Sequence, residues 1–306
     1  MTISKISIRL AIALIIVGAA YMIYRSIGEY SLEEVTASLR TIPAARIAAA
    51  LGFAALSYLC LSGFDYLALH YAGKPLAYRR AALASFCSLS IGHNVGVAAL
   101  SSGAIRYRFY SRWGLTAGDV AKVIIFSGLT VGLGLSTLGG IGLLLYPADA
   151  VGLLGLQRPA IMGIGITCLA APVLYLGLCQ VLRRPLHIRK WSIELPEPRL
   201  ALPQIAIGAA NFACVAGCLH QLMSAFAELA YLQVAATYVV GNATALMSHV
   251  PGGLGVLEAT VLYLIPGAGS LAALVAFRVI YFFVPLAIGL PVFLTSEFVL
   301  SRRRTT

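Results

Sequence analysis

Long apolar runs, separated by short polar or basic segments, dominate the chain. The clearest runs cover residues 10–24, 48–69, 124–146, 160–182 and 272–300. A helix needs about 20 predominantly apolar residues to cross a bilayer. The strand-like alternation typical of a membrane β-barrel is not visible in the sequence. The pattern therefore predicts an all-α polytopic membrane protein.

Two further apolar runs, 81–103 and 232–266, are interrupted near their middle by residues that disfavour a continuous helix. Each flank is shorter than the ~20 residues that a crossing needs. Each run is therefore predicted to form a re-entrant hairpin, which enters and leaves the membrane on one side. The breaks are assigned to Gly92, Gly96 and Gly103 in the first run and to Pro251, Gly252, Gly253 and Gly255 in the second.

The distribution of basic residues supports two hairpins, because Lys and Arg are enriched in cytoplasmic loops. With both hairpins in place, every basic cluster falls on the cytoplasmic side. The clusters are Lys5/Arg9, Lys74/Arg79/Arg80, Arg106/Arg108/Arg112, Arg183/Arg184/Arg189/Lys190/Arg199 and Arg302/Arg303/Arg304. The prediction is about six full spans plus two hairpins, or about eight hydrophobic segments, in a bacterial inner membrane with both termini cytoplasmic.

The order of the segments is helix, helix, hairpin, helix, and it occurs twice within a single transmembrane domain. The first repeat covers about 1–148 and the second about 149–306. His93 and His249, one in each break, lie 249 − 93 = 156 residues apart, about half the chain. Three crossings per repeat would turn the second copy upside down. Inverted repeats with broken helices are typical of transporters.

Composition narrows the function further. Only 11% of the residues are charged, against about 25% in soluble domains. The net charge of +11 is explained by membrane orientation, so no nucleic-acid partner is predicted. The six cysteines form no CxxC pair, and we expect no metal site and no cofactor. No set of nucleophile and base stands out, so we do not expect an enzyme.

The two breaks are the best candidate sites, because non-helical backbone at membrane depth is tolerated only against protein or a wet cavity. A helix that restarts there presents free N–H groups suited to a phosphate. Asp65 and Glu297, in contrast, are expected to be interfacial. The candidate headgroup-binding residues are His93, Asn94, Arg106, Arg108, His249, Glu258, Arg278 and Tyr281.

Structural alternatives stay open for most of these candidates. A charge at the bilayer centre costs about 2.5–3.5 kcal/mol on insertion scales, so Glu258 and Arg278 either form a purely structural ion pair or bind a headgroup. Arg106 and Arg108 either bind lipid phosphate or act as ordinary cytoplasmic anchors. The two histidines either contact a headgroup or satisfy broken backbone.

Three stretches resemble the lysylphosphatidylglycerol synthase transmembrane family, which includes the flippase domain of MprF-type proteins and stand-alone YbhN-like proteins. They are SSGAIRYRFYSRWGLT, GNATALMSHVPGGLGVLE and ALVAFRVIYFFVPL, at 101–116, 241–258 and 273–286. The resemblance implies a phospholipid flippase without the cytoplasmic synthase domain. Aminoacylated phosphatidylglycerol or a related lipid would be its substrate.

Two alternatives remain at this point. The same layout fits a secondary transporter of a small solute or ion, and it fits an accessory subunit of a lipid-modifying enzyme. The partners left open are a membrane phospholipid, a separate lipid-modifying enzyme and a second copy of the chain.

Overall fold

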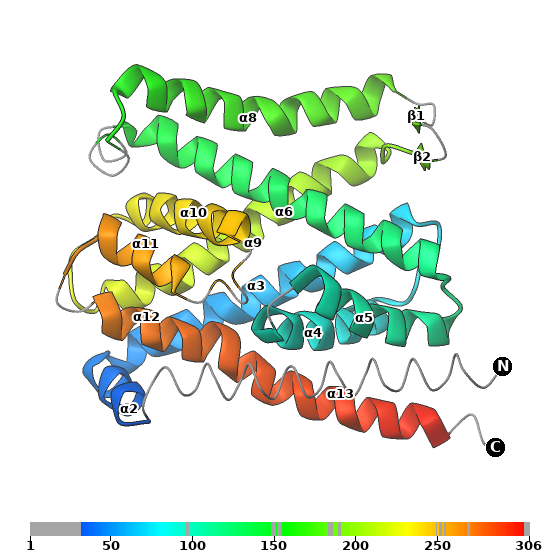
Figure 1. Ribbon diagram of the computed structural model, residues 1–306, viewed down its shortest axis with the longest axis horizontal. Coiled ribbons are helices and arrows are strands. Elements are labelled where there is room, and N and C mark those ends of the chain that lie inside the picture. Colours follow the sequence, from blue (N-terminus) through cyan, green and yellow to red (C-terminus); the bar gives the residue numbers. More distant parts are fainter. Residues whose placement is uncertain are drawn as a thin grey trace.

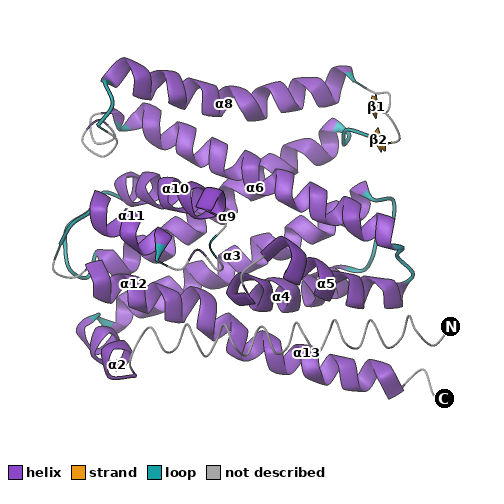
Figure 2. Cartoon of the chain, in the orientation of Figure 1, coloured by secondary structure: helices purple, strands orange, loops and turns teal. Residues whose placement is uncertain are grey.

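A computed structural model describes residues 32–95, 98–147, 151, 155–182, 186–188, 191–248, 250, 253, 255–267 and 270–302. Over these ranges the protein is helical apart from one small β-hairpin (Figures 1 and 2). The predicted first helix and four predicted site residues lie outside the described residues. These four are Gly96, His249, Pro251 and Gly252.

The first half of the described chain contains five α-helices and a short 3₁₀-helix. They are α2 (Leu32–Thr41), α3 (Ala44–Tyr71), α4 (Tyr78–Val95), α5 (Ala98–Tyr110), η1 (Ser111–Trp113) and α6 (Ala117–Leu145).

The second half begins with a long helix and a two-stranded antiparallel sheet, and it ends with helices on either side of a π-helix. The elements are α8 (Arg158–Val181), β1 (Leu186–Ile188), β2 (Trp191–Ile193), α9 (Pro198–Met223), α10 (Tyr231–Ser248), α11 (Val256–Leu264), α12 (Ser270–Arg278), η3 (Val279–Phe283) and α13 (Val284–Arg302).

Local sequence explains where α6 and α9 begin. Thr116 caps α6, since its side chain accepts a hydrogen bond from the Asp119 backbone N–H, and the Asp119 carboxylate accepts one from the Thr116 backbone in return. This reciprocal capping satisfies donors that would otherwise be free in the first turn. Helix α9 begins at Pro198, a residue whose missing N–H costs nothing at a first helical position.

Five segments of the described chain are long and apolar enough to cross a membrane. They are Ala44–Tyr71, Ala117–Leu145, Arg158–Val181, Pro198–Met223 and Leu271–Phe298. Each coincides with a predicted crossing, and the remaining predicted crossing lies outside the described residues. Large apolar side chains also face outward; Ile125 is 65% exposed and Val173 is 69% exposed. The prediction of a helical, multi-pass membrane protein is confirmed.

Helices α3 and α9 form the centre of the bundle. Figure 1 shows α6 and α8 along one side of them and α12 and α13 along the other. Helices α6 and α9 approach closely at Gly134 and Gly208. A Cβ on Gly134 would lie 2.5 Å from the Gly208 carbonyl atoms. Small residues at such crossings let backbones touch, which is how helices commonly pack in membranes.

The two interrupted runs form the helix pairs α4/α5 and α10/α11, which we name the first and second hairpin from their shape alone, and neither pair is among the five candidate spans. Figure 1 places the pairs toward opposite ends of the bundle, with their broken ends near its middle. Helix starts recur at nearly constant spacing. From α3 to α9 the spacing is 198 − 44 = 154 residues, and from α4 to α10 it is 231 − 78 = 153.

The position of the first break differs from the prediction. Helix α4 continues through Gly92 to Val95, so the interruption follows Val95. A Cβ on Gly92 would lie 2.8 Å from the Ser102 Cβ, and the glycine therefore serves the close packing of α4 against α5. Gly103 likewise lies inside α5 and faces Ile124, not the break.

Candidate functional site

Arg278, at the end of α12, holds the second hairpin from inside the bundle. Its guanidinium forms an ion pair with Glu258, to which Nε and Nη2 both donate. Nη2 also donates to the Gly253 carbonyl at 3.2 Å. The Phe282 ring lies 4.7 Å from the guanidinium carbon, close enough for a cation–π contact. Arg278 is 2% exposed and Glu258 6% exposed, so the pair is buried.

Glu258 also organises the restart of the helix after the second break. Its Oε2 accepts a hydrogen bond from the Gly255 backbone N–H at 3.0 Å, and a carboxylate is favoured in the first turn of a helix. Gly253 and Gly255 have φ angles of +60° and +77°, which favour glycine. The pair of Glu258 and Arg278 thus fixes this irregular backbone as well as neutralising two charges.

The last turn of α4, at the tip of the first hairpin, contacts the π-helix η3, which directly follows Arg278. The Asn94 side chain donates to the Ser90 carbonyl at 2.8 Å and to the Phe282 carbonyl at 3.3 Å. The His93 ring contacts the rings of Tyr58 and Phe282 edge to face, with centroids 6.4 and 6.2 Å away. Within the described chain, the buried His93 Nδ1 has no hydrogen-bond partner. Residues of both hairpins therefore reach one short segment, which contains Arg278 and η3.

Tyr281, the candidate within η3, is anchored in the core. The Ser57 hydroxyl donates its proton to Asn211 Oδ1 at 2.7 Å. The Tyr281 hydroxyl lies 2.8 Å from Ser57 Oγ and therefore donates to Ser57 Oγ. The Phe277 ring stacks on Tyr281 with a centroid distance of 5.5 Å. This chain of contacts ties η3 to the crossing of α3 and α9. A π-helix is rare and is often found at functional sites.

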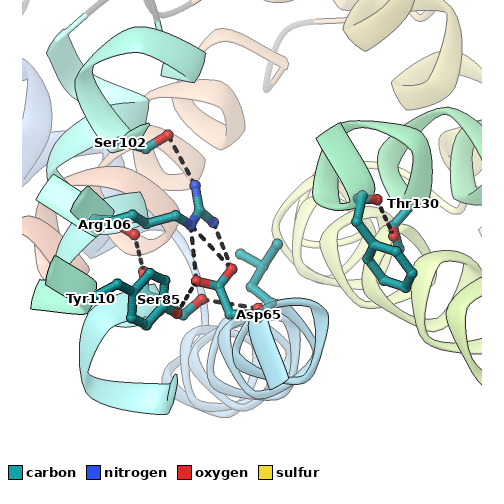
Figure 3. Close-up of polar contacts among 9 residues, drawn as sticks. Asp65, Ser85, Ser102, Arg106, Tyr110 and Thr130 are labelled. Atoms are coloured by element: carbon teal, nitrogen blue, oxygen red, sulfur yellow. Dashed lines mark hydrogen bonds and ion pairs between the residues drawn. The ribbon is translucent and has the colours of Figure 1, made fainter. Parts of the chain in front are cut away.

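Arg106, in the second arm of the first hairpin, forms a buried ion pair with Asp65 of α3. Its Nε and Nη2 donate to the Asp65 carboxylate at 2.8–3.2 Å, and its Nη1 donates to Ser102 Oγ at 3.1 Å. Tyr110 donates to the same carboxylate at 2.6 Å. Figure 3 shows the Arg106 side chain directed at Asp65, with Ser102 and Tyr110 beside it. Asp65 is fully buried and Arg106 is 4% exposed.

These contacts overturn the interfacial prediction for Asp65. The carboxylate lies inside the bundle, where it joins α5 to α3. The apolar run around Asp65 contains a signal for this, because a charge in a membrane helix requires a partner. Its partner, 41 residues away on another helix, could not be chosen from sequence.

Arg108 lies nearer the end of the bundle and pairs with Glu297 of α13. Glu297 Oε2 accepts hydrogen bonds from Arg108 Nε and Nη2 at 3.0 and 2.9 Å and from Arg112 Nη2 at 2.6 Å. The side chains of Arg108 and Glu297 are 32% and 20% exposed. Arg106 and Arg108, two residues apart, thus serve separate ion pairs.

Comparison with known proteins identifies the family. The family of the lysylphosphatidylglycerol synthase TM region matches residues 6–289. The chain belongs to this family. The match includes both hairpins and the pair of Glu258 and Arg278, and it ends before Glu297. The resemblance predicted from the sequence is confirmed.

Two relatives of this family member are similar over most of their length. The uncharacterized protein slr0712 of Synechocystis is 34% identical over 261 residues, which cover 84% of this chain and 81% of the relative. The inner membrane protein YbhN of Escherichia coli is 30% identical over 277 residues, which cover 87% and 84%.

Proposed function

We propose that this member of the family is a phospholipid translocase, which moves a headgroup between leaflets past the meeting point of the two hairpins. One observation carries the proposal: polar ends of both hairpins reach the segment with Arg278 and η3 in the interior of the bundle. Charged residues inside a membrane commonly mark the path of a substrate. The acyl chains would stay in the bilayer.

The layout of the helices supports two inverted repeats. The recurring helix spacing fits repeats of about 1–148 and about 149–306. The positions of the pairs α4/α5 and α10/α11 toward opposite ends fit two hairpins that enter from opposite sides (Figure 1). Repeats of this kind let one half rock against the other around a fixed central site.

The distribution of charges supports cytoplasmic termini. The loops and helix ends around α4, η1 and the start of α9 carry Lys74, Arg79, Arg80, Arg112 and Arg199 against Asp119, Glu194 and Glu197. The opposite end carries Arg40, Arg46 and Arg158 against Glu33, Glu34 and Glu228. By the positive-inside preference, the more basic end faces the cytoplasm.

A headgroup with both a phosphate and an amine suits the pair of Glu258 and Arg278. Separating two buried charges is unfavourable if either is left alone. A zwitterionic or aminoacylated headgroup offers an anion to Arg278 and a cation to Glu258, so each residue exchanges one partner for another. The family name, which refers to lysylphosphatidylglycerol, agrees with such a lipid.

Translocation without synthesis is the expected activity, with a separate lipid-modifying enzyme supplying the lipid. Outward movement of a lipid with net charge +1 opposes an inside-negative potential by about 2.3 kcal/mol per 100 mV. Transport therefore needs a lipid gradient or coupled ions, and Glu258 is our candidate proton carrier.

A lipid-flip assay tests the proposal. The full chain is reconstituted in liposomes with lysylphosphatidylglycerol, and the lipid reaching the opposite leaflet is measured over time. We expect transfer by the wild type and at least tenfold slower transfer by Glu258→Gln and Arg278→Gln, since one charge-assisted hydrogen bond is worth about 1.5–3 kcal/mol. Arg40→Gln, an exposed arginine outside the site, is the matched control.

The outcomes separate the site from the activity. Undiminished transfer by both site variants would remove Glu258 and Arg278 from the site. Absence of transfer by the wild type, with uptake of a soluble solute instead, would favour a secondary transporter.

A further inference from the structure

A second polar cluster lies where α5 and η1 meet α13, away from the segment with Arg278. It consists of Arg108, Arg112 and Glu297, and we call it the α13 cluster. One carboxylate oxygen, Glu297 Oε2, receives all three hydrogen bonds from the two arginines. The other oxygen, Oε1, is buried and has no partner among the described residues.

Arg112 has an unused hydrogen-bond donor, just as Glu297 has an unused acceptor. Its Nη2 donates to Glu297, but its Nη1 is also buried without a partner in the described part of the chain. The α13 cluster therefore holds one unused charged donor and one unused charged acceptor. A buried polar group without a partner is unfavourable, and more so when it is charged, so both atoms favour a ligand that supplies the missing bonds.

The charge of the surroundings defines the ligand further. Arg80 lies over the Trp113 ring at 5.7 Å and adds a third cation beside η1. Three arginines against one carboxylate leave a formal surplus of 3 − 1 = +2. This surplus favours an anionic ligand, and arginine donors match the oxygens of a phosphate.

Apolar surface beside the α13 cluster indicates that this anion belongs to a lipid. Leu294 and Phe298 of α13, on either side of Glu297 in sequence, are 47% and 59% exposed, and Tyr107 of α5 is 41% exposed. Tyrosine and tryptophan are enriched at the level of the headgroups. Arg108, the most exposed member of the cluster, can move outward to admit a headgroup.

We propose that the α13 cluster binds an anionic phosphodiester lipid whose headgroup also carries a hydrogen-bond donor. Arg112 Nη1 donates to a phosphate oxygen, and Glu297 Oε1 accepts from a hydroxyl of the headgroup. A glycerol headgroup satisfies both atoms, whereas a choline headgroup offers no donor. This site holds its lipid whether or not the protein transports lipids.

Lipid retention tests the proposal. The purified full chain is placed in nanodiscs of phosphatidylcholine, alone or doped with phosphatidylglycerol or phosphatidylmethanol, and the lipids that stay bound are measured by native mass spectrometry. We expect phosphatidylglycerol to be retained best. Phosphatidylmethanol, with the same charge and no hydroxyl, should follow, and phosphatidylcholine should be last.

Three variants locate the site. Arg112→Gln should lower retention of phosphatidylglycerol about tenfold, which corresponds to one charge-assisted hydrogen bond. Glu297→Gln should abolish the preference for phosphatidylglycerol over phosphatidylmethanol. Arg112→Lys, which keeps the charge but loses the forked geometry, should keep part of the preference for anionic lipids. Monodisperse elution of each variant checks that it is folded.

Several outcomes would overturn the inference. Equal retention of phosphatidylcholine and phosphatidylglycerol would refute an anion site. Equal retention of phosphatidylglycerol and phosphatidylmethanol by the wild type would refute the role of Glu297. An equal loss in Arg40→Gln would show unspecific charge attraction. Displacement of the lipid by soluble glycerol phosphate would assign the cluster to a free phosphate compound.

Discussion

Each hairpin is tied to a neighbouring helix by one buried ion pair, and the two pairs have opposite polarity. In the first hairpin the second arm carries the cation, Arg106, and helix α3 supplies Asp65. In the second hairpin the second arm carries the anion, Glu258, and helix α12 supplies Arg278. Such pairs contribute less to net stability than to fixing one arrangement, because removing both charges is often tolerated while removing one is not.

Asp65→Asn should lower the free energy of unfolding by about 3–5 kcal/mol, because it leaves the Arg106 charge buried without its counter-ion. The double variant Asp65→Leu/Arg106→Met should be less destabilised than the single one. Unfolding in detergent with increasing denaturant measures both. A double variant as unstable as Asp65→Asn would show that the pair is needed for packing beyond its charges.

Tyr281→Phe should cost about 1 kcal/mol of stability, the usual contribution of one hydrogen bond, since it removes the bond to Ser57. Tyr263→Phe is the matched control, because Tyr263 is 81% exposed. The same detergent unfolding experiment compares the two. Equal stabilities would mean that the contact of Tyr281 with Ser57 does not hold η3 in place.

At the scale of elements, glycines decide where helices touch. Gly134 and Gly208 bring α6 against α9, and Gly92 brings α4 against α5. Sequence predicted Gly92 as a break because glycine disfavours a helix. The same residue in a membrane helix also permits close packing, and only the neighbouring arm, with Ser102 opposite, distinguishes the two roles.

Gly134→Ala should destabilise the protein by about 1–3 kcal/mol, as expected for overpacking, because the new methyl group would overlap the Gly208 backbone. Gly132→Ala is a control on the same helix, where nothing lies within 4 Å of the added Cβ. That change should be neutral or slightly stabilising, since alanine is the better helix former. Thermal unfolding in detergent gives the comparison, and equal effects would refute the close approach.

At the scale of the whole molecule, the bundle has a basic end and a less basic end. Arg80 and Lys74 are exposed near the start of α4, and Arg40 is exposed at the end of α2. The difference predicts orientation because cytoplasmic loops retain Lys and Arg. Orientation also decides from which side each hairpin would receive a headgroup.

Single cysteines in a cysteine-free background test this orientation. A membrane-impermeant thiol reagent added to intact cells, after the outer membrane has been made permeable, should label Arg40→Cys and leave Arg80→Cys unlabelled. Lysis should then make Arg80→Cys reactive. The reverse pattern would place the termini outside and invert the proposed direction of the hairpins.

Sequence alone specified a helical, multi-pass membrane protein, the two interrupted apolar runs and the family, because apolar length and helix-breaking residues are local properties. It also indicated that Glu258 and Arg278 need partners. Which charges meet depends instead on how the helices pack. Asp65 and Arg106 lie 41 residues apart on different helices, and their pairing depends on how α5 packs against α3. Energies of buried charges depend on distance and surroundings, which the order of residues does not specify.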